Sequence, residues 1–134
     1  LSLAGVPIPK TVEGADLSAV VRSGRENSGH DALYMSVSPF AGKEFTTAYR
    51  AIRTSRYTFV RDLNGPWLLF DHDADPWQLR NLVGLPEHAA LQARLDAQLQ
   101  QKLAAQHDEF RPGPEYIAKW GYKVNARGTV DYTN

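Results

Sequence analysis

The order of apolar and polar residues along the chain predicts four strands followed by one long helix. Runs rich in apolar and β-branched residues at 31–37, 45–54, 57–62 and 67–71 are separated by short turns. Short connections favour antiparallel pairing between neighbours. Residues 86–107 then carry leucine at every fourth position, a spacing typical of a helix with one buried stripe. The pattern predicts an α+β fold, with about four antiparallel strands and one long C-terminal helix packed on the sheet.

The last two predicted strands are joined at Asn64-Gly65, a dipeptide that tolerates the positive φ angles of a two-residue hairpin turn. A turn centred there sets the register as Asp62 with Trp67, Val60 with Leu69, and Phe59 with Phe70. In this register Phe59 and Leu69 lie on opposite faces, and both faces carry large apolar residues. A sheet with one wet face alternates more strictly. We therefore expect the second face to be covered as well, by a helix of this chain or by another domain.

Three aspartates alternate over residues 71–75, which suggests two interpretations. A calcium-binding loop of the EF-hand type needs Gly at its sixth position and Glu at its twelfth, where this chain has Pro76 and Leu82. The second interpretation is a capped helical turn, with Asp75 as N-cap and Gln78 completing a capping box. We favour the second, in which the carboxylates shape a turn.

Shorter elements flank this region. Residues 16–22 are predicted to form a short helix capped by Asp16 and stopped by Gly24. After the long helix the composition changes. Residues 110–114 contain two prolines and a glycine and predict a turn, and residues 115–122 predict a helical turn.

The composition argues against several classes of function. The 134 residues contain 15 basic and 15 acidic side chains, so nucleic-acid binding has no electrostatic support. There is no cysteine, which excludes disulfides and thiolate metal sites. No apolar run approaches the roughly 20 residues of a membrane span, and no signal peptide is visible. Because the chain starts without Met inside an apolar segment, we expect it to be a piece of a longer protein.

Few residues suggest chemistry directly. The four histidines show no i, i+4 spacing, and neither an H-E-x-x-H nor a G-x-S-x-G motif nor a phosphate-binding Gly-rich loop occurs. His30 precedes a predicted strand and is the histidine that we expect to face a pocket. The other three, at positions 72, 88 and 107, are expected in a turn or at helix ends.

Three arginines fall within one predicted strand, Arg50 and Arg56 on one face and Arg53 on the other. Arginine can clamp a sulfate or a carboxylate. The more common role is an exposed charge that pairs with Asp or Glu, and we give that interpretation the greater weight.

Two segments resemble the C-terminal subdomain of the sulfatases, the formylglycine-dependent branch of the alkaline-phosphatase superfamily. Residues 50–59 (RAIRTSRYTF) are similar to the family strand R-A-[IV]-R-[TD]-x-[RK]-Y-K-[YF], and residues 69–82 (LFDHDADPWQLRNL) to L-Y-D-L-x-x-D-P-x-E-x-x-N-L. The departures are Thr58 for Lys, Phe70 for Tyr and Gln78 for Glu.

The beginning of the chain agrees with this resemblance. Residues 3–9 and 12–17 resemble the family's L-A-G-V-x-x-P and x-G-x-S-L segments, which follow the last helix of its catalytic domain. The resemblance covers about residues 1–107. It implies the end of a catalytic-domain helix and a linker at 1–24, the sulfatase C-terminal subdomain at 25–109 and a C-terminal extension at 110–134.

The resemblance implies a sulfatase whose reaction is carried elsewhere. The family's C/S-x-P-x-R motif, which yields formylglycine, does not occur here, and no metal ligand can be mapped onto this chain. The parent is expected to use formylglycine and a divalent cation, commonly calcium, on a small-molecule or glycan sulfate ester. This chain would brace the catalytic domain and form part of a pocket rim through His30, Arg50 and Arg53. Family analogy favours a periplasmic or secreted location, with the cytoplasm remaining open.

Two alternatives remain at this point. One is the same subdomain of a phosphonate monoester or phosphodiester hydrolase. The other is an independent protein-interaction module that uses the second face of the sheet. A subdomain separated from its parent is expected to self-associate through apolar surface around Trp67 and Leu69.

Overall fold

The computed structural model describes most of the chain and divides it into two compact units. The described residues are 1–12, 14–24, 31–36 and 48–130. The first unit is Leu1–His30 and the second is Asp31–Asn134. The second unit contains the sheet and the long helix, and it is the part on which the candidate site depends.

The first unit contains a 3-10 helix, η1 (Ser2–Ala4), and a short helix, α1 (Ser18–Ser23). The Asp16 carboxylate accepts hydrogen bonds from the Ser2 hydroxyl at 2.6 Å and from the Ser18 N–H at 2.9 Å. These bonds, led by the one from Ser2, lower the pKa of Asp16 to about 2. Gly24 ends α1 with φ 64°, so the predicted stop is confirmed, whereas the N-cap is Leu17 and not the predicted Asp16.

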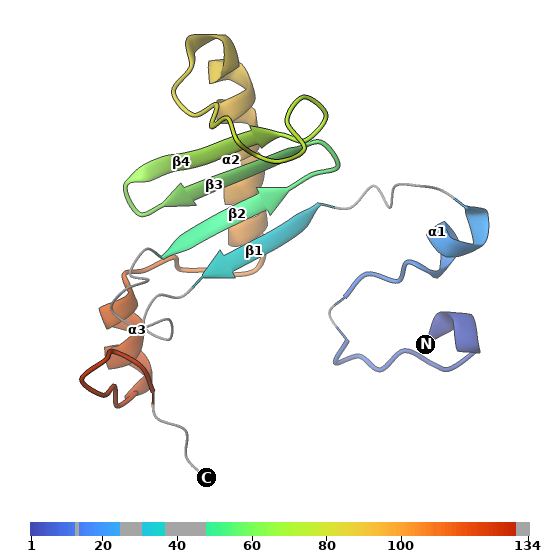
Figure 1. The fold of residues 1–134 in the computed structure, drawn as a ribbon. Helices are drawn as coiled ribbons and strands as arrows, with labels where there is room; N and C mark the ends of the chain where they lie inside the picture. Colours follow the sequence, from blue (N-terminus) through green and yellow to red (C-terminus); the bar gives the residue numbers. More distant parts are fainter. Residues whose placement is uncertain (13, 25–30, 37–47, 131–134) are drawn as a thin grey trace. The chain divides into compact units, whose positions relative to one another are not determined.

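Four antiparallel strands form one sheet in the order β1-β2-β3-β4 (Figure 1). They are β1 (Ala32–Ser36), β2 (Tyr49–Arg53), β3 (Tyr57–Asp62) and β4 (Gly65–Asp71). The predicted fold class and strand number are confirmed. The expected strand at 45–54 begins at Tyr49, and residues 45–47 lie outside the described part of the chain.

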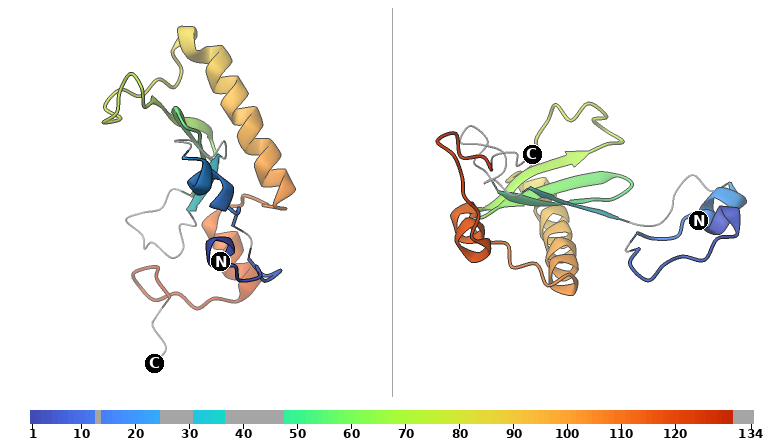
Figure 2. Two further views of the ribbon diagram at one scale, coloured as in Figure 1. Left: turned by 90° about the vertical axis from the view of Figure 1, so that its right-hand side faces the viewer. Right: turned by 90° about the horizontal axis from the view of Figure 1, so that it is seen from below.

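The long helix α2 (Ala89–Ala105) follows a 3-10 turn, η3 (Pro86–His88), and lies along one face of the sheet (Figures 1 and 2). Its buried residues are Leu95, Leu99 and Leu103, three members of the predicted leucine stripe. Proline at the first helical position costs nothing, because that N–H has no partner within a helix. The burial of the three leucines against the sheet confirms the predicted packing of the helix.

The core lies between α2 and the side of the sheet that carries Ile52, Phe59 and Leu69, which we call the helix-covered face. These three residues are paired across β2, β3 and β4, and none has exposed surface. They form one cluster with Leu82 and the buried leucines of α2. Burying a side chain of this size contributes about 1.5–3 kcal/mol.

The other side of the sheet, which we call the opposite face, carries Tyr34, Ala51, Val60, Trp67 and Phe70. Ala51, Val60 and Phe70 are buried, whereas Tyr34 is 49% exposed and Trp67 41% exposed. The Trp67 ring lies 6.2 Å from the ring of Tyr49 on the same face. This face is covered only in part, in contrast to the continuous core under α2.

The register predicted for the β3–β4 hairpin is wrong. Phe59 pairs with Leu69, not with Phe70, and Val60 pairs with Leu68. Phe59 and Leu69 therefore share a face. The two residues at the centre of the turn are Leu63 and Asn64, because Asp62 pairs with Gly65.

The physical cause is the side chain of Asp62. Its carboxylate accepts hydrogen bonds from the N–H groups of Asn64 and Gly65, at 2.7 and 3.0 Å. This Asx-type turn moves the hairpin centre one residue towards the N-terminus. The ladder then shifts by one residue between Val60 and Arg61, leaving Trp67 as the additional residue of a β-bulge.

The capped helical turn predicted after β4 is also wrong. Gln78 has φ 55°, outside the helical region, and its N–H bonds to the Asp75 carbonyl at 3.0 Å. The Asp75 carboxylate accepts from the Arg80 N–H at 2.7 Å instead of capping a helix. The aspartates do shape a turn, as predicted, but the turn does not continue into a helix.

The chain after α2 forms a third helix, α3 (Gly113–Trp120), which Gly121 ends with φ 65°. It starts inside the segment that was predicted as a turn, because Pro114 is compatible with the first turn of a helix. An isolated bridge pairs Val124 with Val130. Among the described residues, no helix has the length and apolar character needed to cross a membrane.

Candidate functional site

Arg50 lies in the middle of a buried polar network. Its side chain is 3% exposed, and its Nε and Nη2 atoms bond to the two carboxylate oxygens of Asp108 at 2.6 and 3.0 Å. Nη2 also donates to the Tyr116 hydroxyl at 3.3 Å, and the guanidinium lies 4.5 Å from the ring centroid of Phe110. A bidentate arginine–carboxylate pair of this kind fixes both position and orientation.

The charge of Asp108 is stabilised by this network. Burial alone raises the pKa of a carboxyl group, but the hydrogen bonds from Arg50 and from the Phe110 N–H at 2.6 Å outweigh it. The pKa of Asp108 is therefore lowered. The network joins β2 to the segment after α2, across 58 positions of sequence.

Arg53 lies on the same strand but on the opposite face, and its side chain is exposed. It pairs across the ladder with Thr58, whose hydroxyl lies 2.8 Å from Nε2 of His72. Burial, followed by the positive charge of Arg53, lowers the pKa of His72. An exposed guanidinium beside a neutral imidazole and a hydroxyl can bind an anionic oxygen.

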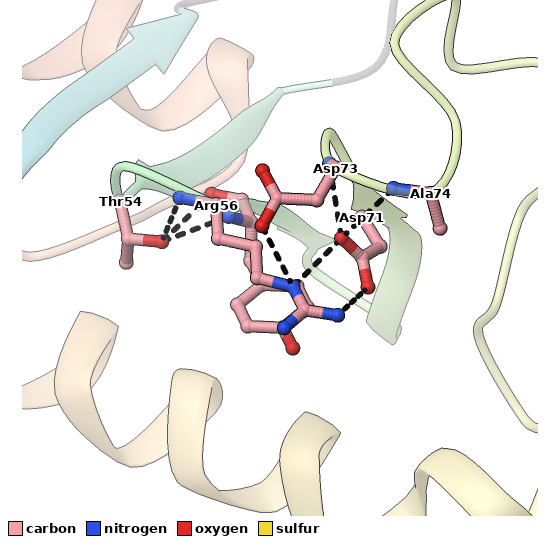
Figure 3. A network of polar contacts seen from close by, with 6 residues as sticks. Thr54, Arg56, Asp71, Asp73 and Ala74 are labelled. Carbon is pink, nitrogen blue, oxygen red and sulfur yellow. Dashed lines mark hydrogen bonds and ion pairs between the residues drawn. The ribbon is translucent and has the colours of Figure 1, made fainter.

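Arg56 belongs to the turn between β2 and β3 and not to β2 itself. Figure 3 shows its guanidinium facing Asp71, to which Nε and Nη2 bond at 2.9 and 2.7 Å. Asp73 lies 3.5 Å from Nε. The Asp71 hydrogen bond raises the pKa of Arg56, and the bond from Arg56 lowers the pKa of Asp71.

This turn is held by backbone bonds as well (Figure 3). Thr54 Oγ1 accepts from the N–H groups of Arg56 and Tyr57, at 3.3 and 2.8 Å. Asp71 Oδ1 accepts from the N–H groups of Asp73 and Ala74. The aspartates of the former calcium-loop alternative are thus used to fix two adjoining turns.

Of the three predicted rim residues, the structure describes Arg50 and Arg53. Arg50 and Arg53 lie on opposite faces, as the strand parity predicted, and His30 is outside the described residues. The interpretation of arginines as ion-pair partners holds for Arg50 and Arg56. The sequence reasoning missed Asp108, since no local pattern marks a partner so distant. The sequence reasoning also placed His72 only in a turn. In the structure His72 follows Asp71, the last residue of β4, and its Nε2 lies 2.8 Å from the Thr58 hydroxyl.

A cavity of about 330 Å³ lies where α2 ends and α3 begins. It is lined by Arg50, Gln106, His107, Asp108, Glu109, Tyr116, Lys119 and Trp120. In the described part of the chain, no group of three or more His, Cys, Asp or Glu side chains is arranged to hold a metal ion. These residues therefore do not fit a catalytic cation.

Comparison with known proteins identifies the family to which this chain belongs. Residues 1–105 match the family described as N-sulphoglucosamine sulphohydrolase, C-terminal. The chain belongs to this family. The resemblance to the sulfatase C-terminal subdomain is thereby confirmed.

Individual relatives agree with the family. An ulvan-active sulfatase of Formosa agariphila is 44% identical over 122 residues, which is 91% of this chain and 24% of that protein. An N-acetylglucosamine-6-O-sulfatase of Bacteroides thetaiotaomicron is 28% identical over 120 residues, covering 84% of this chain and 21% of the relative. A solved structure of a 2-O GAG sulfatase superposes with a TM-score of 0.68 at 25% identity, over 82% of this chain and 24% of that one. The chain spans about a quarter of the length of these sulfatases.

The family motif residues now have physical roles. In residues 50–59, Arg50 holds the segment after α2 and Arg56 holds the turn after β4. In residues 69–82, the Asp71 carboxylate accepts a hydrogen bond from the Arg56 guanidinium, and the Asp75 carboxylate accepts one from the Arg80 N–H. These motif side chains fix segments and turns within the subdomain, whereas the side chain of Arg53 is exposed.

Proposed function

We propose that this chain is the non-catalytic C-terminal part of a sulfatase that hydrolyses sulfate esters, and that it braces the catalytic part of the parent. The observation that carries the proposal is the match of nearly the whole chain to about a quarter of an ulvan-active sulfatase. The absence of a C/S-x-P-x-R motif from the chain supports it. Formylglycine and a divalent cation, calcium by family analogy, would be supplied by the catalytic part.

The surface that supports a bracing role is the loop after β4. Trp77 and Leu79 are 83% and 84% exposed, the highest values among the exposed large apolar residues in the described part of the chain. The loop that carries them is fixed by the Asp75 bonds to Gln78 and Arg80. Large apolar side chains held outward on a fixed backbone favour a partner surface. We assign this surface to the catalytic part. In its absence we expect self-association through this loop and not around Leu69, which is fully buried in the core.

The exposed cation at Arg53 supports a second role, as part of a pocket rim. Arg50 is already engaged by Asp108 and Tyr116, so we assign it to holding the extension at 110–134. Arg53, beside Thr58 and His72, remains as the rim residue that could contact a sulfated substrate. His30, near the start of the expected subdomain at 25–109, stays a second member of the proposed rim.

The bracing proposal is tested in the full-length parent by changing Trp77→Ser and Leu79→Ser together. We expect a lower unfolding temperature and faster proteolysis between the two parts, because the contact surface loses its apolar area. Gln98→Ser, on the exposed side of α2, is the matched control and is expected to change neither. An unchanged unfolding temperature and unchanged proteolysis in the double variant would contradict the bracing role.

The rim proposal is tested with Arg53→Ala in the parent. Loss of a charge-assisted hydrogen bond to sulfate should raise KM by about tenfold with a smaller change in kcat. Arg53→Lys should recover part of the loss, because the charge remains. A KM that does not change in the alanine variant would remove Arg53 from the rim.

This chain alone is expected to release no sulfate from 4-nitrophenyl sulfate at any calcium concentration, and turnover would overturn the non-catalytic assignment.

A further inference from the structure

The cavity at the junction of α2 and α3 has features that neither bracing nor a pocket rim uses. It lies at the end of α2, and its lining includes three groups of different chemistry. These are the Trp120 indole, the His107 imidazole and the Lys119 ammonium. Its volume of about 330 Å³ lies at the lower end of the range of about 300–1,000 Å³ typical of ligand pockets.

The aromatic wall is built to be rigid. The rings of Tyr116 and Trp120 are stacked with centroids 4.9 Å apart and planes at 21°, and the Trp120 ring meets Tyr122 edge to face at 5.9 Å. The Tyr116 hydroxyl is fixed by bonds from Arg50 and from the Arg111 N–H at 3.0 Å. Trp120 is nevertheless 50% exposed. A rigid, half-exposed indole needs little ordering when a flat ligand stacks on it.

His107 adds an independent observation. It has φ 55° where α2 ends, and the following N–H, of Asp108, bonds to the Leu103 carbonyl at 2.9 Å. This is the Schellman-type position that glycine fills most easily. A side chain there is strained, and strain retained at a cavity points to function. Here the strained residue places an imidazole in the wall of the cavity.

The charges of the cavity are balanced in pairs. Lys119 Nζ bonds to Glu109 at 2.7 Å, and this bond is the largest cause of the lowered pKa of Glu109. Arg111, which lies outside the lining, bonds to the same carboxylate at 3.0 Å and is itself paired with Glu115. Arg50 is paired with Asp108. Two cations facing two carboxylates provide no net field for a polyanion. They do provide donors and acceptors for hydroxyl groups beside an aromatic surface.

We propose that this cavity binds a neutral pyranose ring of a glycan, with an apolar face of the sugar stacked on Trp120 and its hydroxyls bonded to Lys119, Glu109 and His107. A six-membered sugar ring combines flat C–H surfaces with hydroxyls at its edge, which matches the aromatic wall and the balanced polar rim. The proposal goes beyond the bracing role, because it places a glycan contact on the C-terminal extension. It uses none of the residues that are assigned to docking or to the sulfate rim.

The test uses the whole chain and a panel of neutral methyl pyranosides of glucose, galactose, xylose and rhamnose. Each is titrated while the indole N–H signals of the tryptophans are followed by NMR. We expect a saturable shift of the Trp120 signal for at least one sugar, with the Trp67 and Trp77 signals unmoved. Trp120→Ala should weaken binding about tenfold or more, whereas Trp77→Ala, which removes an indole outside the cavity, should leave it unchanged.

A second variant keeps the test decisive if Trp120→Ala fails to fold. His107→Gly removes the imidazole and relieves the positive φ, so it should raise stability while it weakens sugar binding. Unchanged binding in a stable His107→Gly variant would remove His107 from the site. No saturable Trp120 shift with any sugar of the panel would overturn the proposal. Binding of heparin alone, abolished by salt and retained in Trp120→Ala, would also overturn it, because that pattern is nonspecific charge attraction.

Discussion

The two faces of the sheet differ although the same strands form both. On the helix-covered face, Ile52, Phe59 and Leu69 have no exposed surface and pack against the leucines of α2. On the opposite face, buried residues are interrupted by Tyr34 and Trp67, which are nearly half exposed. The first face supplies the stability of this chain. On the second face, Tyr34 and Trp67 leave apolar surface exposed in the described part of the chain.

The arginines of β2 show the same contrast. Arg50 points to the helix-covered face and is enclosed by Asp108 and Tyr116, whereas Arg53 points to the opposite face and is exposed. Two chemically identical side chains three positions apart therefore have separate roles. Strand parity determines which arginine is buried and which is exposed.

The largest expected effect is in the core of the helix-covered face. Phe59→Ala should lower the free energy of unfolding by about 3–5 kcal/mol, because it leaves a cavity among Ile52, Leu69 and Leu99. Tyr34→Ser on the opposite face should change it by about 0.5 kcal/mol or less. Urea denaturation measures both. Equal losses in the two variants would show that the faces do not differ in this way.

The arginine pair gives the next largest difference. Arg50→Met leaves the carboxylate of Asp108 buried without its partner, which should cost about 3 kcal/mol of unfolding free energy. Arg53→Met, the matched substitution on the other face, should stay within about 0.5 kcal/mol. If Arg53→Met proved as destabilising as Arg50→Met, the assignment of Arg53 to contacts outside the chain would fail.

Acid should weaken the chain in two stages. Because the folded pKa of His72 lies below its ordinary 6.5, the unfolded state binds more protons and stability falls below that pH. The lowered pKa values of Asp71 and Asp108 cause a second fall below their ordinary 3.8. Asp108→Asn should reduce the second stage and leave the first. Denaturation midpoints at a series of pH values would follow both stages, and an unaltered second stage would exclude Asp108 as its source.

The smallest expected effect is at the exposed loop. Trp77→Ser with Leu79→Ser should change the stability of this chain by about 0.5 kcal/mol or less, since both side chains are exposed. Sedimentation of the same variant should show less self-association than the unchanged chain. A large loss of stability would mean that the loop contributes to the subdomain's own fold, and it would weaken the bracing proposal.

The sequence predicted those features that depend on local periodicity. The strands, the leucine stripe of α2 and the opposite directions of Arg50 and Arg53 follow from periods of two and about 3.6 residues. The hairpin register could not be predicted, because the Asp62 carboxylate selects a different turn centre from the one that Asn64-Gly65 suggests. The prediction of a capped helical turn after β4 was wrong for a similar reason, because the Asp75 carboxylate bonds to the Arg80 N–H and not to a helix N-terminus.

The site was less predictable than the fold, because it depends on contacts between distant segments. Nothing near Arg50 in sequence identifies Asp108, and nothing near Tyr116 indicates that its hydroxyl will meet Arg50. The balance between Lys119 and Glu109 also arises only when α3 turns back towards the end of α2. Family motifs located the important segment, and three-dimensional pairing separated its structural residues from the exposed one.

The span between Arg50 and Asp108 has a consequence for biosynthesis. A ribosome adds about 5–20 residues per second, so Asp108 is made roughly 3–12 s after Arg50, which lies 58 positions earlier. By the end of that interval the ribosome has added the remaining strands and α2, but burial of the guanidinium before Asp108 is present would leave a charge without its counterion. The nascent sheet is therefore expected to keep Arg50 in water and to close over it only when the last turn of α2 has emerged. A messenger that ends before the codon for Asp108 would yield a chain with the apolar core but an open, chaperone-accessible edge.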